Sequence, residues 1–349
     1  MLLDSFQRPL NDLRISVTDR CNYRCAYCMP RDEYAWLERE EILTFDEMAR
    51  LARIFLSLGV EKIRLTGGEP LVRRDLEVLV RKLAGLPGLE DLCITTNGSW
   101  LVEKAGPLRA AGLNRLNVSL DTLDPEKFKK ITKRGELEPV LKGIEEAKRH
   151  GFDSIKINAV IERGVNEDDI LTLVEYGRRN RLSVRFIEYM DVGNANDWHS
   201  DRVVPKSEIL ETIHRRYPLR GWGPTFGRAE GPAGRQANGN APSQDYEFMD
   251  GEGEVGIIAS VTEPFCATCS RVRLTADGRF VTCLFSQDGM DLKGPLRAGA
   301  SDEEIARRIS SVWRKREDRY SEQRLEALHS IQGYRPKDHP KIEMIQLGG

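Results

Sequence analysis

The sequence predicts an α/β protein built on an incomplete, TIM-like (β/α)6 barrel, followed by a smaller C-terminal domain. From about residue 12 to about residue 190, short apolar segments alternate with longer segments of helical periodicity. Such alternation implies parallel strands joined by right-handed crossovers. Six strand–helix units are found, whereas a complete barrel has eight. The composition then changes near Gly193, which marks the end of the barrel pattern.

The barrel strands are the short apolar runs between the helical segments. We expect them at Leu13–Thr18, Lys62–Thr66, Asp91–Thr96, Arg115–Leu120, Ser154–Ile161 and Val184–Tyr189. After the first strand, Thr44 and Glu47 form a capping box that begins a helix. This helix runs to Leu58, and Gly59 ends it. Further helices are expected at Pro125–Lys133, Glu138–His150 and Glu167–Asn180.

Three regions follow one another along the chain: the barrel at 1–220, a flexible insertion at 221–250 and the C-terminal domain at 251–349. Gly221–Ser243 is rich in Gly, Pro, Asn, Ser and Gln, which is typical of a surface insertion. In the third region we expect strands at Glu254–Val261 and Ser270–Thr275 and a hairpin turn at Ala276–Arg279. We also expect a helix that is capped by Ser301 and runs through about Lys315. A charged stretch extends it to about His329.

The near-neutral charge and the lack of long apolar runs narrow the classes of partner. A formal net charge of -2 over 349 residues gives no argument for a nucleic-acid or anionic membrane surface. No run of about 18 apolar residues and no N-terminal signal pattern is present, so we expect neither a membrane span nor secretion. Seven cysteines in such a chain fit reduced thiols and a cytoplasmic location.

Three cysteines directly after the first strand carry the strongest chemical signal. Cys21, Cys25 and Cys28 form a Cys-x3-Cys-x2-Cys array. Three thiolates can hold three irons of a 4Fe-4S cluster, and the fourth iron would then stay open to bind and activate a small molecule. The alternatives are a zinc site or incidental thiols. Zinc sites usually close with a fourth Cys or His at short spacing, and none follows here.

A second trio, Cys266, Cys269 and Cys283, repeats this pattern near the C-terminus. A second cluster with an open iron would offer an anchor for a ring nitrogen or oxygen. Zinc remains an alternative if a remote histidine completes the site; the candidates are His199, His214 and His329. The seventh cysteine, Cys93, lies in an apolar strand and is interpreted as a small buried hydrophobe.

Cationic side chains recur on strands that should be apolar. Because strand residues alternate between two faces, several cations are expected to point into one space; they are Arg14, Lys62, Arg64, Arg115, Lys156, Arg185, Arg271 and Arg273. An unpaired cation in a dry interior costs on the order of several kcal/mol, so these residues predict a polyanionic ligand. The alternative is that they are rim residues in ion pairs with carboxylates such as Glu188.

Gly67-Gly68-Glu69-Pro70 follows the second strand. Two glycines let the backbone approach a ligand closely, and the Glu69 carboxylate could receive an ammonium group. On its own, this segment would be only a turn.

Together, these motifs resemble the GTP 3′,8-cyclase family of molybdenum cofactor biosynthesis, within the radical S-adenosylmethionine (SAM) superfamily. The resemblance runs from about Arg8 to the last residue, except at 221–250, where this chain is longer and more polar than the family leads us to expect. It rests on the segments Cys21–Cys28, Gly67–Leu76, Thr95–Gly98, Asn117–Asp121, Arg185–Asn194, Phe265–Arg273 and Gly348–Gly349.

The resemblance implies SAM and two 4Fe-4S clusters as cofactors and GTP as substrate. It assigns Cys21, Cys25 and Cys28 to the SAM-cleaving cluster, and Cys266, Cys269 and Cys283 to a cluster that binds the substrate. The implied SAM contacts are Tyr27, Gly68, Glu69, Ser119 and Met190. The implied GTP contacts are Arg14, Lys62, Arg64, Thr95, Lys156, Arg185, Arg271, Val272 and Arg273. Gly348 and Gly349 would insert toward the active site and support catalysis there.

The implied reaction is radical. Reductive cleavage of SAM gives a 5′-deoxyadenosyl radical that takes H3′ of GTP. The C3′ radical attacks guanine C8 and, after one-electron reduction, gives 3′,8-cyclo-7,8-dihydroguanosine 5′-triphosphate. The resemblance also implies an electron donor, a downstream cyclic pyranopterin monophosphate synthase and a homodimer. Two alternatives stay open: a radical SAM peptide maturase with an auxiliary cluster, and a non-catalytic zinc or iron-sulfur interaction module. Peptide maturases usually carry more C-terminal cysteines than the three found here.

Overall fold

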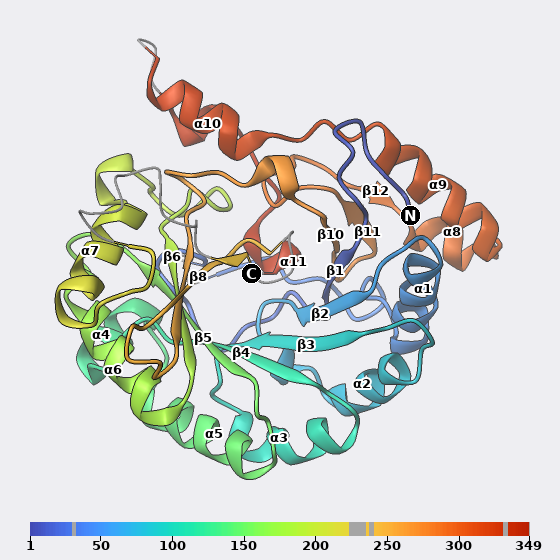
Figure 1. Cartoon of the computed structure of the whole chain (residues 1–349). Coiled ribbons are helices and arrows are strands. Elements are labelled where there is room, and N and C mark those ends of the chain that lie inside the picture. Colours follow the sequence, from blue (N-terminus) through green and yellow to red (C-terminus); the bar gives the residue numbers. More distant parts are fainter. Residues whose placement is uncertain (30–32, 223–234, 237–240, 331–333, 349) are drawn as a thin grey trace.

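The computed structural model describes residues 1–29, 33–222, 235–236, 241–330 and 334–348 (Figure 1). Within them, twelve strands form one sheet in the order β12-β11-β10-β1-β2-β3-β4-β5-β6-β9-β8-β7. The strands are β1 (Asp12–Ser16), β2 (Lys62–Thr66), β3 (Asp91–Thr96), β4 (Arg115–Ser119), β5 (Ile155–Ile161), β6 (Ser183–Glu188), β7 (Arg235–Gln236), β8 (Gln244–Glu247), β9 (Glu254–Ile258), β10 (Arg271–Leu274), β11 (Arg279–Val281) and β12 (Met290–Asp291).

Helices form a ring outside the barrel strands, while the last short helix, α11, lies within the ring (Figure 1). The α-helices are α1 (Phe45–Ser57), α2 (Leu76–Ala84), α3 (Leu101–Ala110), α4 (Pro125–Thr132), α5 (Leu137–Arg149), α6 (Ile170–Asn180), α7 (Lys206–Arg216), α8 (Lys293–Arg297), α9 (Asp302–Arg314), α10 (Tyr320–Leu328) and α11 (Met344–Leu347). Short 3-10 helices lie at Pro70–Val72, Glu167–Asp169, Ser200–Arg202, Cys266–Thr268 and Pro336–Asp338. The predicted capping box of α1 is confirmed: Thr44 accepts a hydrogen bond from the Glu47 amide, and the Glu47 carboxylate accepts one from the Thr44 amide.

The C-terminal strands continue the barrel sheet at both of its edges. Strands β1 to β6 pair in parallel with their sequence neighbours. β10 then pairs in parallel with β1, and β9 pairs in parallel with β6. The outer edges of β10 and β9 are taken by the antiparallel strands β11 and β8. The barrel therefore stays open between β9 and β10, because each already has two neighbours.

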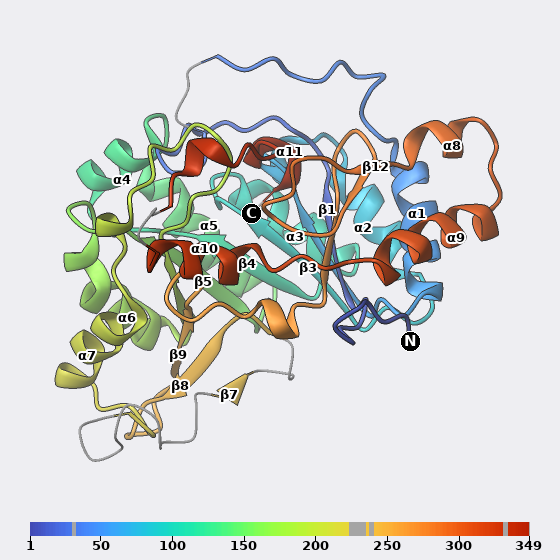
Figure 2. The same cartoon turned by 90° about the horizontal axis from the view of Figure 1, so that it is seen from above.

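The structure differs from the expectations at two places in the C-terminal half. The predicted insertion at 221–250 includes β8, whose pairing with β9 places Tyr246 in the core, so sheet structure begins earlier than expected. Most of Gly221–Ser243 lies outside the described residues. The helix capped by Ser301 ends at Arg314, and α10 is a separate helix. α9 packs beside α1, where Arg50 Nε lies 2.7 Å from Asp302 Oδ1 (Figure 2). Among the described residues, no helix has the length and apolar character needed to span a membrane.

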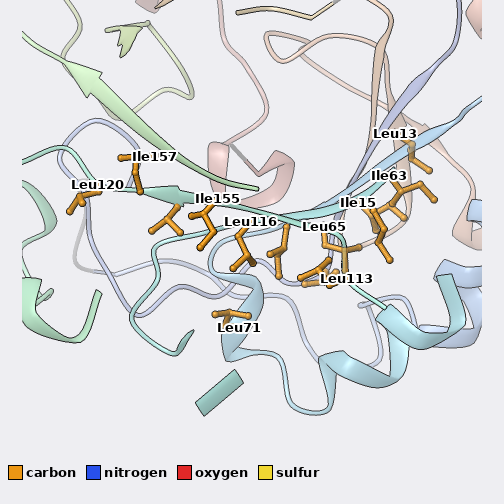
Figure 3. Close-up of a cluster of buried hydrophobic side chains, with 14 of the residues drawn as sticks. Leu13, Ile15, Ile63, Leu65, Leu71, Leu113, Leu116, Leu120, Ile155 and Ile157 are labelled. Atoms are coloured by element: carbon orange, nitrogen blue, oxygen red, sulfur yellow. The ribbon is translucent and has the colours of Figure 1, made fainter. Parts of the chain in front are cut away.

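The main core lies between the sheet and the outer helices. Figure 3 shows side chains of Leu13, Ile15, Ile63, Leu65 and Ile157 gathered there, and all five are buried. Because strand residues alternate between faces, the residues between them in sequence point to the other side of the sheet. Packing of one face against the helices thus directs the polar residues into the barrel interior.

Candidate active site

The inner face of the strands encloses a cavity of about 340 Å³. Most of the predicted site residues line it: Cys21, Cys25, Cys28, Tyr27, Gly68, Glu69, Ser119, Met190, Arg14, Lys62, Arg64, Thr95, Lys156, Arg185, Arg271 and Arg273. Five other predicted residues are not among its lining residues: Cys266, Cys269, Cys283, Val272 and Gly348. The side chain of Val272 is fully buried in the core on the opposite face of β10. Gly349 lies outside the described residues.

Three arginines stand next to one another across three parallel strands. In the sheet register, Arg14 of β1 is paired with Arg273 of β10 on one side and with Arg64 of β2 on the other. Arg14 and Arg273 are 7% and 2% exposed and have no ion-pair partner among the described residues. Burial, followed by the charges of Arg64 and Arg273, holds the pKa of Arg14 well below its usual range. Burial also opposes the charge of Arg64, but Cys93 and Asp12 outweigh it and raise the pKa of Arg64. The excess positive charge of this arginine layer therefore lies on Arg14 and Arg273, whose pKa values are lowered.

The layer nearer the amino ends of the strands is self-neutralising by comparison. Asp12 is paired in register with Arg271 on one side and Lys62 on the other. Lys62 is paired in turn with Asp91, whose carboxylate accepts a 2.8 Å hydrogen bond from Arg115 Nε. Acid and base alternate here, so this layer needs no ligand to balance its charge.

Unsatisfied polar atoms also concentrate at the cavity. The Nε atoms of Arg14, Arg64, Arg185 and Arg273, together with Thr95 Oγ1 and Asn158 Oδ1, are buried without a hydrogen-bond partner. Buried polar groups are rarely left unpaired, so these atoms point to a missing polar ligand. Farther along the sheet, cations have carboxylates nearby: Arg185 Nη2 lies 3.5 Å from Asp245, and Lys156 Nζ lies 3.9 Å from Glu254.

The proposed counter-ion Glu188 serves another purpose. Its carboxylate accepts hydrogen bonds from the backbone amides of Lys206, Val261 and Thr262 at 2.8–2.9 Å. It pairs with no cavity cation among the described residues, so Glu188 as the counter-ion is wrong. The ion-pair alternative itself is confirmed for Arg115, Lys156 and Arg185, which pair with Asp91, Glu254 and Asp245.

The first cysteine trio faces the cavity from the carboxyl ends of the strands, beside Gly67–Pro70. A Cβ on Gly68 would lie 2.2 Å from the Arg20 carbonyl oxygen, so only glycine fits between the two loops. We call the segment Gly67–Pro70 the glycine corner. Glu69 stabilises it by accepting hydrogen bonds from Leu71 N, Thr96 Oγ1 and Asn97 N at 2.7–2.9 Å. Burial raises the pKa of the Glu69 carboxyl to about 7 despite these donors.

The second trio lies at the other end of the strands, where the backbone amides of Asn11 and Asp12 donate to the Ser270 carbonyl. Arg271 Nε donates to the Cys269 sulfur at 3.3 Å. Burial raises the pKa of the Cys269 thiol, but Arg271 and Arg316 outweigh it and bring the pKa to about 6. Cys283 and Cys28, one from each trio, pack against the same small apolar cluster of Val192, Phe285 and Met344. All six cysteines are free thiols of intermediate exposure.

Comparison with known proteins connects this geometry to a family. Residues 15–177 match the model of the radical SAM superfamily, and residues 182–322 match the model described as Molybdenum Cofactor Synthesis C. A protein of Acidothermus cellulolyticus named GTP 3′,8-cyclase is 46% identical over 370 residues, which cover 99% of this chain and 98% of that protein. GTP 3′,8-cyclase 1 of Mycobacterium tuberculosis is 44% identical over 354 residues, covering 99% and 95%.

The chain belongs to the GTP 3′,8-cyclase family. Among solved structures, SuiB of Streptococcus suis bound to S-adenosylmethionine has a TM-score of 0.58 at 14% identity, covering 92% of this chain and 68% of that one. SuiB bound to its precursor peptide SuiA has a TM-score of 0.59 at 16% identity, covering 94% and 67%. These likenesses confirm the predicted radical SAM fold, a partial barrel with a C-terminal part.

The first trio fits the iron-sulfur cluster expected of a radical SAM protein. Its three free thiols share one cavity with the glycine corner at Gly68, and a thiolate donor set is the one that iron-sulfur clusters require. Within the described ranges, no three His, Cys, Asp or Glu side chains are arranged so as to hold a single metal ion. The seventh cysteine, Cys93, is 2% exposed, as expected for a small buried residue.

Several cavity residues were missed from the sequence. Asp12 and Asp91 look like ordinary strand-end residues, and only the sheet register shows that they neutralise neighbouring cations. Asp121 ends the family motif Asn117–Asp121, and it accepts a 2.8 Å hydrogen bond from the Tyr27 hydroxyl and lines the cavity. Its place directly after a barrel strand was the available signal, since such positions carry catalytic residues in barrels. Met344 reaches the cavity from the C-terminal tail, for which no local pattern exists.

Proposed function

We propose that this protein is a radical SAM lyase that converts GTP to 3′,8-cyclo-7,8-dihydroguanosine 5′-triphosphate, the first step of molybdenum cofactor biosynthesis. The arginine layer carries this proposal. Arg273 and Arg14 are buried, Arg64 beside them is half-buried, and none of the three forms an ion pair among the described residues. This row suits a triphosphate because guanidinium groups bind phosphate oxygens in bidentate fashion.

Cys21, Cys25 and Cys28 would hold the SAM-cleaving cluster. When bound there, this cluster supplies the electron that cleaves SAM, so that a 5′-deoxyadenosyl radical can take H3′ of GTP and C3′ can bond to C8. The protein's part is to place SAM and GTP beside each other and exclude water. The residues that would contact SAM line the same cavity as this trio: Tyr27, Gly68, Glu69, Ser119 and Met190.

GTP would lie between the two trios. The side chains that would donate to it are those of Arg14, Lys62, Arg64, Thr95, Lys156, Arg185, Arg271 and Arg273. Val272 could contribute only its backbone. Cys266, Cys269 and Cys283 would hold a second cluster whose open iron anchors the guanine. The Arg271–Cys269 contact supports this role, because a guanidinium favours the thiolate form that a cluster needs.

The C-terminal tail would close the cavity. A Cβ on Gly348 would lie 2.4 Å from Thr66 Oγ1 and 2.8 Å from Gly67 N, so the end of the tail touches the glycine corner itself. We further propose that the enzyme acts in the cytoplasm as a homodimer, takes electrons from a separate donor and passes its product to cyclic pyranopterin monophosphate synthase.

Anaerobic turnover with GTP and SAM tests the function. The reconstituted protein should bind about eight irons per chain and form 5′-deoxyadenosine together with a cyclised nucleotide. Release of 5′-deoxyadenosine that does not depend on GTP but responds to a peptide would favour the peptide maturase alternative. About two zincs per chain and no turnover would favour a non-catalytic metal module.

A further inference from the structure

A buried carboxylate after β6 accepts hydrogen bonds from several side chains of the C-terminal segment. Asp191 follows Met190, and its side chain is fully buried. Its carboxylate accepts a hydrogen bond from the Tyr320 hydroxyl at 2.6 Å and from Lys341 Nζ at 2.8 Å. Tyr334 and Arg324 donate to the same carboxylate. Four side chains from residues 320–341 thus converge on one acid.

The residues next to Asp191 hold the same segment. Lys341 Nζ also donates to the Asp191 carbonyl at 2.9 Å, and the Lys341 amide donates to Asn194 Oδ1 at 2.8 Å. Arg324 and Lys341 are almost fully buried, and Asp191 is the only carboxylate with which either forms an ion pair among the described residues. Loss of one partner from such a buried pair leaves an uncompensated charge in the interior.

The segment fixed in this way leads straight to the cavity. After Lys341 the chain runs through the buried Ile342 to Met344, which lines the cavity, and then to Gly348 against the glycine corner. Figure 1 shows α11 within the ring of helices. Asp191 therefore connects the segment that carries Met190 to the tail that covers the cavity.

We propose that Asp191 is a positioning residue that fastens the C-terminal tail over the cavity and so couples SAM cleavage to GTP cyclisation. The second part rests on the proposed function, because it assumes that Met190 contacts SAM. When the tail detaches, small molecules of the medium reach the cavity, and the 5′-deoxyadenosyl radical can take a hydrogen atom from a C–H or S–H bond of an organic buffer or thiol reductant instead of from C3′ of GTP. The variant should consequently release more 5′-deoxyadenosine per cyclised nucleotide.

Asp191→Asn tests the fastening directly, since it keeps the side-chain volume and removes the charge. Hydrogen exchange of the amides of residues 342–348 in the full-length protein should accelerate by at least about tenfold, because the local opening free energy falls. The matched control is Glu162→Gln. Glu162 is also a buried carboxylate beyond a barrel strand, but it pairs with Arg202 and touches no tail residue among those described.

The second readout is the ratio of deoxyadenosine to cyclised nucleotide in the reconstituted enzyme. It should rise severalfold in Asp191→Asn and stay unchanged in Glu162→Gln. Should Asp191→Asn fail to fold, Tyr334→Phe removes a single donor and should shift both readouts in the same direction by less. A double variant Asp191→Asn, Lys341→Met also removes one of the two stranded cations and should recover part of the tail protection.

Unchanged exchange at 342–348 in a folded Asp191→Asn protein would overturn the fastening. Accelerated exchange with an unchanged product ratio would overturn the coupling. Exchange is measured without turnover, so the fastening is judged even if wild-type protein forms no cyclised nucleotide. That last outcome would count against the proposed function instead.

Discussion

Replacement of Arg273 by Met should stabilise the ligand-free protein and weaken GTP binding at the same time. Arg273 is 2% exposed, has no ion-pair partner among the described residues and stands in register beside Arg14. Burial and the charge of Arg271 lower its pKa to about 10, so its surroundings in the protein oppose this cation. Methionine fills a similar volume without the charge.

The two effects have different sizes. Replacing a buried ion pair by apolar residues is often neutral or stabilises by about 1–4 kcal/mol. Arg273 has no partner that its removal would leave unpaired, so urea denaturation should give a free energy of unfolding higher by about 1 kcal/mol. Loss of a hydrogen bond to a charged group costs about 1.5–3 kcal/mol, which corresponds to roughly a 10- to 150-fold weaker Kd for GTP. Anaerobic calorimetry should show this loss for GTP and a smaller one for guanosine, while SAM binding persists.

Arg279→Met is the matched control on the neighbouring strand. Its side chain is 49% exposed and pairs with Asp277 and Asp288. Neither the free energy of unfolding nor the free energy of GTP binding should therefore change by more than about 0.5 kcal/mol. If Arg273→Met destabilised the ligand-free protein, or left the GTP affinity intact, the arginine layer would not be a strained phosphate site and the central argument for GTP would fail.

Other changes test separate parts of the site. Gly348→Ala places a methyl group against Thr66 at a backbone φ of 70°, so cyclised product should fall by at least about tenfold while SAM still binds, and a fully active variant would contradict tail closure. Cys283→Ser should halve the iron content from about eight to about four per chain, as measured by metal analysis, and an unchanged iron content would remove Cys283 from the ligands. Burial raises the pKa of Asp121 from 3.8 to about 6, so its ionisation opposes folding and stability should fall as pH rises through that interval. Asp121→Asn should flatten this part of the urea-denaturation profile, and an unaltered slope would assign the pH dependence to other groups.

Local pattern was enough to place the cations but not to tell which of them need a ligand. The bounds of β2 and β3 follow directly from the sequence, and two-residue alternation puts Arg64 on the inner face. Compensation depends on register between strands: Asp12 neutralises neighbours on β2 and β10, and β10 begins at residue 271. No sequence pattern specifies which residues of two distant strands face each other, so the self-neutralising layer could not be separated from the arginine layer.

Asp191 shows the same limit more sharply. Its partners lie 129 to 150 residues farther along the chain, and single Tyr, Arg and Lys residues in a polar tail carry no periodic signal. The family motif marks the position of Asp191 without giving its contacts. By contrast, the cysteine trios could be predicted as sites because their ligands are close in sequence and their residue type is chemically specific.

The pairing of β10 with β1 places the two trios at opposite ends of the same strand. The strands are parallel, so Cys266 and Cys269, which precede β10, meet the amino end of β1, whereas the trio beginning at Cys21 leaves from its carboxyl end. A strand of five residues spans roughly 16 Å at about 3.3 Å per residue. A substrate that contacts both ends must therefore be elongated, and the arginine layer between them requires it to be anionic. A nucleoside triphosphate meets both conditions, whereas a small uncharged metabolite meets neither.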